Sequence, residues 1–383
     1  MPIQQITSTD IANLPTSSVG ATQLATGSVE GYLNTQGSAF GFRNRIINGA
    51  MVIDQRNAGN SVSSPSGYIV DRWVVESSNS STTAQQVSDA PPGFAKSLKF
   101  TSTTGGTISS GSYCDVTQKI EGYNIYDLNF GLPSASSFTV SFWVKSSITG
   151  IFALTLRMDG ANIGYFTTYT INNPNTWQYV TVTVPGNTAT AFASTTNGIG
   201  LSVGFLLGAG STYISSTANT WTTGGSNGYG QINTATGSNS VFTTTGATWQ
   251  VTGVQLEKGS VATPFEYRDY GRELQMCQRY YWKTQTTYFP GKANGTTQWY
   301  GSICCPVSMR TTPTPSLGAG TSYCFVYNGN TGLASTTGTS FTVSSISDNY
   351  IFMQVYHDGF SGLTDNSIVT YRNGGNLAFS AEL

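Results

Sequence analysis

Apolar and polar residues alternate along much of the middle of the chain. In SFTVSFWVK (residues 137–145), apolar side chains occupy every second position from Phe138 to Val144, and Trp143 and Lys145 fall on the opposite face. The segments 151–158 (IFALTLRM), 179–184 (YVTVTV) and 200–207 (GLSVGFLL) repeat this period. A period of two is typical of half-buried strands, and Gly, Asn, Ser and Pro stand between these segments. The pattern predicts an all-β fold, with a jelly roll or β-sandwich over residues 42–268.

The period changes after Pro264. Asp269 can cap a helix, and Glu273 in the first turn suits the helix dipole. Apolar and aromatic residues then recur at spacings of four, three and four, at Tyr270, Leu274, Cys277 and Tyr281. We therefore predict a short connecting helix and linker over residues 269–295. Strand-like segments resume beyond it and predict a small C-terminal β domain, 296–383, that gains burial by oligomerisation.

The N-terminal region, residues 1–41, has another pattern. Single apolar residues stand four or five positions apart among small polar ones, which fits neither a strand nor an amphipathic helix. Such a segment buries too little apolar surface to order by itself. It is either an extended arm that orders against a docking protein or a flexible tail. If the segment is an arm, we expect it to anchor the chain to the docking protein through Ile6, Ile11, Leu14, Val19 and Leu24.

Charge is scarce and unevenly placed. Charged residues make up 9% of the 383, against about a quarter in typical soluble domains, and the net charge is −1. This balance gives no electrostatic footprint for nucleic acid. No apolar run is long enough to cross a bilayer, so no membrane insertion is expected. The N-terminal residues lack the basic and hydrophobic regions of a signal peptide.

Residues that could carry catalysis are few. His357 is the one histidine, and its neighbour Asp358 would point away from it on a strand. No GxSxG elbow is present, which argues against a nucleophilic triad. A glycosidase-like pair of carboxylates stays open as an alternative. The five cysteines lack regular spacing and are interpreted as buried thiols, with no zinc site; no cofactor is implied, and a structural calcium is left open.

Aromatic residues in uncharged loops suggest surface recognition instead. Tyr213, Trp221 and Tyr229 lie in stretches rich in Gly, Ser, Thr and Asn. A flat ring flanked by hydroxyl and amide groups can stack on a sugar face without using charge. We assign these three residues to glycan binding. The alternative is that they pin their own loops to the sandwich or lie between subunits.

A burst of charge follows the uncharged stretch between Gly160 and Leu256. Segment 253–282 holds eight charged residues of both signs, ending at Arg279. A solvated connector would explain the charge, although it would not explain the apolar face of the predicted helix. We interpret the segment as a packed junction of domains or subunits, in which Arg268, Asp269, Arg272 and Glu273 form ion pairs. Its assigned residues are Tyr270, Arg272, Leu274, Cys277 and Tyr281.

Four local motifs resemble a group of bacteriophage fibre or appendage proteins, including those of cyanophages. The motifs are NRIINGAMVIDQRN (44–57) with YIVDRW (68–73), FTVSFWVKSS (138–147), WQVTGVQLEKGSVATPFEYRDYGRELQMCQRYYW (249–282) and CPVSMRTTPTPSL (305–317). The final FSAEL is also similar to the ends of such fibres. The resemblance carries over no set of sugar-binding residues.

The resemblance implies a fold and a role. The middle region would be a jelly roll like that of carbohydrate-binding modules. The chain would form a homotrimer that is assembled in the host cytoplasm, held to a phage tail or capsid protein by its N-terminal arm, and directed at a host-surface glycan. It would be a structural, non-enzymatic component of the virion. The alternatives are a tailspike-type enzyme that degrades polysaccharide and a decoration fibre on the capsid.

Overall fold

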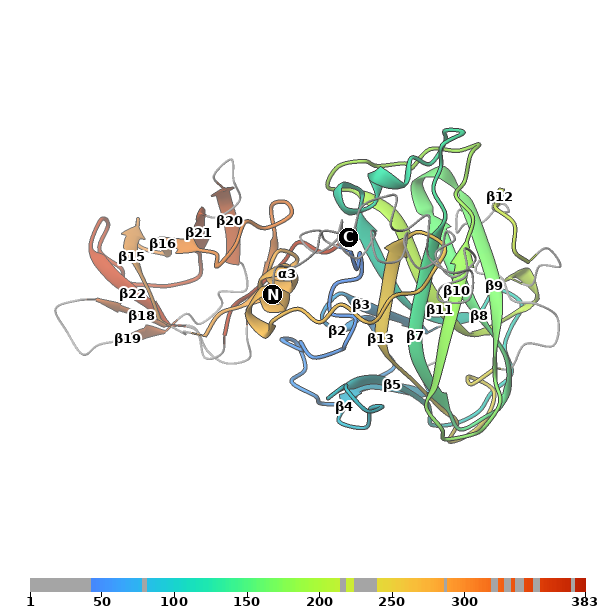
Figure 1. The fold of residues 1–383 in the computed structure, drawn as a ribbon. Helices are drawn as coiled ribbons and strands as arrows, with labels where there is room; N and C mark the ends of the chain where they lie inside the picture. The colour runs from blue at the N-terminus through green and yellow to red at the C-terminus, as the bar shows by residue number, and fades with distance from the viewer. Residues whose placement is uncertain are drawn as a thin grey trace, which may run out of the picture. The chain divides into compact units, whose positions relative to one another are not determined.

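The computed structural model describes residues 43–383 except for 78–80, 214–217, 224–239, 286–287, 318–322, 327–331, 335–340, 347–351 and 373–375. The predicted arm, with Ile6, Ile11, Leu14, Val19 and Leu24, lies outside the described residues. Residues Arg45–Leu383 form one compact unit. Antiparallel strands dominate the described part, so the predicted all-β class is confirmed (Figure 1).

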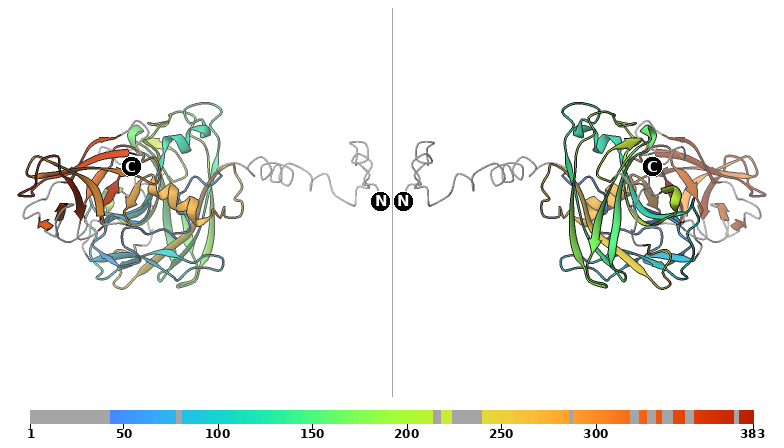
Figure 2. Two further views of the ribbon diagram at one scale, coloured as in Figure 1. Left: turned by 90° about the vertical axis from the view of Figure 1, so that its left-hand side faces the viewer. Right: turned by 90° about the vertical axis from the view of Figure 1, so that its right-hand side faces the viewer.

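Two antiparallel sheets form the first part of this unit. One sheet runs β1 (Val62–Ser63), β4 (Thr82–Val87), β5 (Ser97–Ser102), β13 (Thr248–Lys258), β7 (Phe138–Ser146) and β10 (Gln178–Val184). The other runs β12 (Thr222–Thr223), β9 (Ile163–Ile171), β8 (Gly150–Met158), β11 (Ile199–Ala209), β6 (Tyr113–Glu121), β3 (Trp73–Ser77) and β2 (Ser66–Val70). Figure 2 shows these strands from two further directions.

One hydrophobic core joins the inner faces of the two sheets. The alternating apolar positions predicted from the sequence point into it, including Phe142 of β7 and Leu154 of β8. Phe205 of β11 packs edge-on against Phe142, with ring centroids 4.9 Å apart. Trp249 of β13 is fully buried 5.2 Å from the ring of Phe205. These large side chains make the sandwich a jelly-roll domain with its own core.

A second pair of sheets follows. A seven-stranded sheet runs β19 (Gly332–Ala334), β18 (Tyr323–Val326), β22 (Ile368–Arg372), β15 (Tyr288–Asn294), β16 (Gln298–Cys304), β21 (Phe352–His357) and β20 (Phe341–Ile346). A small sheet runs β14 (Tyr281–Lys283), β23 (Ala378–Ser380) and β17 (Thr314–Ser316). Trp299, Tyr371 and Phe379 are among the residues of a core separate from that of the sandwich. The smaller C-terminal β part therefore has a core of its own.

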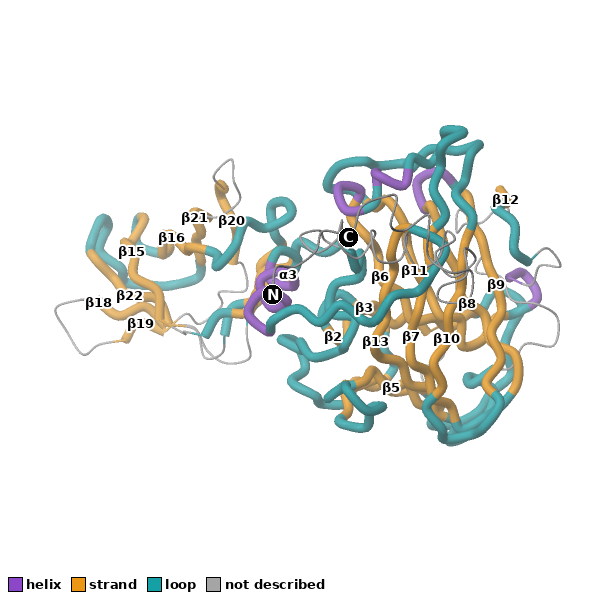
Figure 3. Tube along the Cα trace, in the orientation of Figure 1, coloured by secondary structure: helices purple, strands orange, loops and turns teal. Residues whose placement is uncertain are grey.

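The connecting helix is α3, Tyr270–Gln278, and it stands among strands in Figure 3. Asp269 caps it as predicted, because its carboxylate accepts the backbone N–H of Arg272 at 2.9 Å. The predicted helical face was too long, since the helix ends at Gln278 and Tyr281 begins β14. The other described helical elements are short 3-10 turns: η1 (Gly122–Asn124), η2 (Tyr126–Leu128), η3 (Asp159–Ala161) and η4 (Ser211–Tyr213).

The cap at Asp269 can be tested by substitution. Asp269→Ala removes the acceptor for the amide of Arg272 and should lower the free energy of unfolding by about 1 kcal/mol. Asp269→Asn keeps a good capping side chain and should stay close to the wild type. Urea titrations of the three proteins measure the difference. Equal losses in the two variants would show that the charge of Asp269, and not its cap, is what matters.

Candidate functional site

The outer face of the six-stranded sheet carries an aromatic pair, one half-buried ring and one exposed ring. Trp143 of β7 and Tyr179 of β10 are direct cross-strand partners, and their ring centroids lie 5.3 Å apart. Both side chains point away from the core because their neighbours in sequence, such as Phe142, point into it. Tyr179 is 43% exposed. The pair therefore offers flat apolar surface to solvent.

A third ring is held beside this pair by one carboxylate. Asp89, just after β4, accepts the indole N–H of Trp177 at 3.3 Å and the side-chain amide of Gln250 at 3.2 Å. It also forms an ion pair with Lys145. The Lys145 ammonium lies 5.1 Å from the centroid of Trp177. We call Trp143, Trp177 and Tyr179 the aromatic platform, and Asp89, Lys145 and Gln250 its polar frame.

The charge of the frame is balanced. Partial burial by itself would raise the pKa of Asp89, but the hydrogen bonds from Lys145, Gln250 and Trp177 outweigh it, and the pKa is lowered. The carboxylate is therefore ionised at neutral pH and neutralises Lys145. The ion pair between Asp89 and Lys145 therefore holds Trp177 in place and adds no net charge to the platform.

A bulge in β13 brings another ring close to the platform. The register of β13 against β7 shifts between Thr252 and Gln255, and Gly253 adopts a left-handed φ of 63°. A Cβ on Gly253 would lie 2.6 Å from Phe94 and 3.1 Å from Trp143. Only glycine fits both the backbone and the space. Phe94 in turn contacts Tyr267, at 5.6 Å between centroids, which extends the aromatic surface.

The residues predicted to bind glycan do not belong to this platform. Trp221 packs against the sandwich core, 5.4 Å from the ring of Phe130, and its indole N–H donates to the carbonyl of Pro185 at 2.8 Å. This arrangement matches the alternative in which Trp221 pins its own loop. Tyr213 lies in η4 and meets Tyr113 at 5.3 Å. Tyr229 lies outside the described residues. A glycan contact by any of the three stays a prediction.

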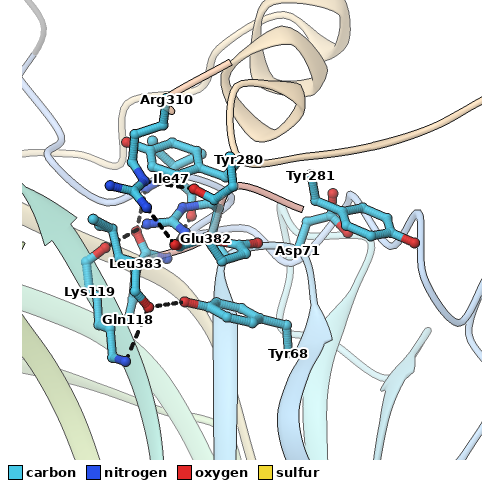
Figure 4. A network of polar contacts seen from close by, with 12 residues as sticks. Ile47, Tyr68, Asp71, Gln118, Lys119, Tyr280, Tyr281, Arg310, Glu382 and Leu383 are labelled. Carbon is cyan, nitrogen blue, oxygen red and sulfur yellow. Dashed lines mark hydrogen bonds and ion pairs between the residues drawn. The ribbon is translucent and has the colours of Figure 1, made fainter. Parts of the chain in front are cut away.

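A buried polar network lies where the sandwich meets the following elements (Figure 4). Its centre is Arg72, which is 1% exposed and pairs with Glu382. The guanidinium also donates to the carbonyl of Lys119 at 2.6 Å and lies 3.6 Å above the ring of Tyr280. Arg56 forms a second ion pair with Glu382 at 3.0 Å. We call this network the joint.

Segment Ala381–Leu383 is the part of the chain that the joint holds. Arg310 donates to the carbonyl oxygens of Ala381 at 2.6 Å and Glu382 at 2.7 Å. The carbonyl of Leu383 accepts from the hydroxyl of Tyr68 at 3.0 Å and from Lys119 at 3.1 Å. The carbonyl oxygen of Leu383 is thus held by two side chains of the sandwich. Burial, together with the nearby carboxylate of Glu382, raises the pKa of Tyr68 to about 12, so its hydroxyl remains a donor.

The residues after α3 complete the joint. Glu121 of β6 accepts from Arg279 at 2.6 Å and from the hydroxyl of Tyr280 at 2.5 Å. Glu273 of α3 accepts the backbone amide of Asn48 and pairs with Arg268 at 3.3 Å. Of the four residues predicted to form ion pairs, Arg268 and Glu273 pair with each other, and Arg279 of the same segment pairs with Glu121 of the sandwich.

The predicted junction residues divide into two groups. Leu274 and Cys277 pack with Ile47, Ile53 and Tyr280 in a small hydrophobic cluster, and the guanidinium of Arg56 lies 3.6 Å above the ring of Tyr281. Tyr270 is 64% exposed, and the side chain of Arg272 is exposed as well. Asp269 acts as a cap that accepts the backbone amide of Arg272, which differs from the ion-pairing role predicted for Asp269. A contact of these residues with another subunit stays a prediction.

His357 and the cysteines occupy structural positions. His357 is buried between the rings of Phe360 and Tyr371, and burial lowers its pKa. Its Nδ1 lies 2.7 Å from the carbonyl of Asp358. Cys114, Cys277 and Cys305 are buried, whereas Cys304 is exposed, which corrects the prediction of burial for Cys304. Burial raises the pKa of Cys305 to about 12.

Among the described residues, no group of three His, Cys, Asp or Glu side chains is placed to hold a metal ion. Within the same part of the chain, no helix has the length and apolar character needed to span a membrane.

Among known proteins, this chain is similar to solved structures and to no family model or curated protein. Similar structures include the enzymatically active domain of tailspike protein 4 from bacteriophage CBA120, at 12% identity and a TM-score of 0.28, covering 56% of this chain and 21% of that one. TmCBM61 in complex with β-1,4-galactotriose is 12% identical, with a TM-score of 0.28, and the match covers 56% of this chain and 99% of that one. The CBM22-1 xylan-binding domain of Paenibacillus barcinonensis Xyn10C is 11% identical, with a TM-score of 0.26, and the match covers 54% of this chain and 99% of that one. The match thus spans about a fifth of the tailspike chain, and function has to be argued from the residues of this protein.

The joint gives a direct stability prediction. Glu382→Gln leaves Arg72 buried without its counter-ion and should lower the free energy of unfolding by about 3–5 kcal/mol. Adding Arg72→Met removes the stranded charge, so the double variant should lose less than the sum of the single losses. Lys258→Gln, which breaks the exposed pair with Asp127, is the control and should cost less than about 1 kcal/mol. Additive losses in a urea-melt cycle would contradict coupling between Arg72 and Glu382.

Proposed function

We propose that this protein is a non-enzymatic fibre subunit of a phage particle that contacts a host-surface glycan through the aromatic platform. The observation that carries the proposal is the cross-strand pair of half-buried Trp143 and exposed Tyr179, with Trp177 beside it, on a sheet face of a domain that is poor in charge. Exposed aromatic residues gathered on one face mark binding surfaces more often than scattered ones do. The four motifs that resemble phage fibres support the virion role.

The chemistry of the platform suits a saccharide. Sugar rings present apolar C–H faces bordered by hydroxyl groups, and an aromatic surface with amide and hydroxyl neighbours complements both features. Thr181 and Thr183 stand on the same face of β10 as Tyr179 and are exposed. The polar frame holds Trp177 in place through Asp89. The rings would therefore be preorganised before a glycan arrives, which reduces the entropy cost of binding.

The fibre role adds an assembly to this binding surface. We infer a homotrimer attached by residues 1–41 to a phage tail or capsid protein, with Ile6, Ile11, Leu14, Val19 and Leu24 as the anchoring side chains. The spacing of these residues and the similarity of SSVGATQLATGSV (17–29) to the short repeats that dock such fibres support this inference. The virion is the corresponding location.

Binding can be tested with variants of the platform. Trp143→Ala with Tyr179→Ala should weaken adsorption to host cells, or to polysaccharide extracted from them, by roughly tenfold or more, which corresponds to about 1.4 kcal/mol. Tyr123→Ala with Tyr126→Ala removes two similarly exposed rings elsewhere and is the matched control. Unchanged adsorption of the platform variant, at wild-type thermal stability, would exclude the platform. Release of reducing ends from the polysaccharide would favour the tailspike-type enzyme instead.

Assembly is tested separately. Light scattering of the purified protein should give the mass of three chains. Deletion of residues 1–41 should abolish incorporation into particles while leaving glycan binding by the remaining chain intact. A monomer at micromolar concentration, or normal incorporation of the truncated chain, would contradict the fibre proposal without affecting the platform.

A further inference from the structure

The seven-stranded C-terminal sheet has two different faces. One face is packed into the second core through residues such as Phe289, Trp299, Val355 and Tyr371, all of which are buried. The residues between them in each strand must point the other way. The registers of the five neighbouring strands place one outward-facing row across the sheet: Ile368, Lys292, Tyr300, Tyr356 and Thr342.

Two tyrosines stand side by side in this row. Tyr300 of β16 and Tyr356 of β21 are direct partners, which places their Cβ atoms about 5 Å apart. The hydroxyl of Tyr300 donates to the side-chain oxygen of Gln354 at 2.6 Å. At the other end of the row, Ile368 is 68% exposed. The row thus combines a pair of rings, a fixed amide and an apolar flank on one exposed sheet face.

The charge of this outer face has one sign. Among the described outward-facing side chains of β15, β16, β21 and β22, the charged ones are Lys292 and Arg372, and none of them is a carboxylate. Arg372 lies 5.3 Å from the ring of Tyr288, and Lys292 contacts the amide oxygen of Asn366 at 3.4 Å. In the adjoining turn, Asp365 accepts the backbone amide of Gly295 at 2.7 Å. Four residues of strand separate the two cations, about 13 Å.

This pattern differs from the aromatic platform of the sandwich. There the cation Lys145 is neutralised by Asp89, and the two groups hold a ring in place. On the C-terminal sheet, Lys292 lies directly beside Tyr300, and Arg372 lies one strand further on the same side of the paired rings, without a carboxylate from the same face. A ligand that stacks on Tyr300 and Tyr356 and extends across β15 and β22 would therefore meet a positive potential along that half of the sheet.

We propose that the outer face of the C-terminal sheet is a second binding site, and that it takes an anionic saccharide. The rings of Tyr300 and Tyr356 stack on the sugar, Gln354 contacts its hydroxyl groups, and Lys292 and Arg372 pair with its acidic groups. The site is independent of the aromatic platform, so it stands or falls without the function proposed above. Its anionic group can be a carboxylate or a sulfate ester, which share the same recognition.

Affinity electrophoresis in gels containing polygalacturonate, dextran sulfate or neutral dextran tests the proposal on the full chain. The wild type should be retarded by an anionic gel and not by dextran, and the two anionic gels separate carboxylate from sulfate recognition. Tyr300→Ala with Tyr356→Ala should weaken retardation at least tenfold. Lys292→Gln with Arg372→Gln should weaken it several-fold and flatten its dependence on salt.

Two controls make the outcome decisive. Lys96→Gln removes a cation from the sandwich and should leave retardation unchanged, as should the platform variant Trp143→Ala with Tyr179→Ala. Equal retardation of the wild type and the tyrosine variant, with both folded by circular dichroism, would overturn the proposal. A change of oligomeric state in the tyrosine variant would also overturn it, because the face would then be a contact between copies of the chain.

Discussion

The ion pair between Arg72 and Glu382 is the contact on which the arrangement of the folded unit depends. A guanidinium that is 1% exposed costs several kcal/mol unless its charge is compensated, and here the compensating carboxylate is 310 residues away in sequence. The pair sits below the ring of Tyr280, next to the hydrogen bonds that hold Ala381 and Leu383. The sandwich, the helix α3 and the C-terminal strands therefore meet around one buried charge.

Several of the few charged side chains in this chain are located at the joint. They form ion pairs with Arg72, Glu121 and Glu273. Three of the four motifs that resemble phage fibres contribute to these contacts: 44–57 with 68–73 through Arg56 and Arg72, 249–282 through Arg279, and 305–317 through Arg310. The aromatic platform and the C-terminal sheet face lie outside the joint, and the remaining motif, 138–147, supplies Trp143 of the platform and Lys145 of its polar frame.

Local patterns in the sequence were enough to predict the strands, the helix and its cap. The alternation in 137–145 placed Trp143 opposite Phe142, and the same reading of 179–184 placed Tyr179 outward, yet nothing local indicated that β7 and β10 are neighbours. The partnership of Arg72 with Glu382 was equally invisible, because no periodicity connects residues so far apart. For Trp221, the sequence left open both a glycan contact and packing of its own loop, and the contact with Phe130 is a tertiary feature that no local pattern indicates. Strand pairing, the partner of Arg72 and the packing of Trp221 depend on tertiary structure, so local sequence patterns could not predict them.

The position of Glu382 also has a consequence for the order of events during synthesis. All strands of the sandwich have left the ribosome before residue 382 is made, so the nascent domain must wait with Arg72 lacking its carboxylate. Contacts of such large sequence separation form late and slow folding. A chain that stops early would keep a buried, uncompensated cation and an incomplete joint. The stability of the sandwich thus depends on a carboxylate that is synthesised well after its last strand, β13, which ends at Lys258.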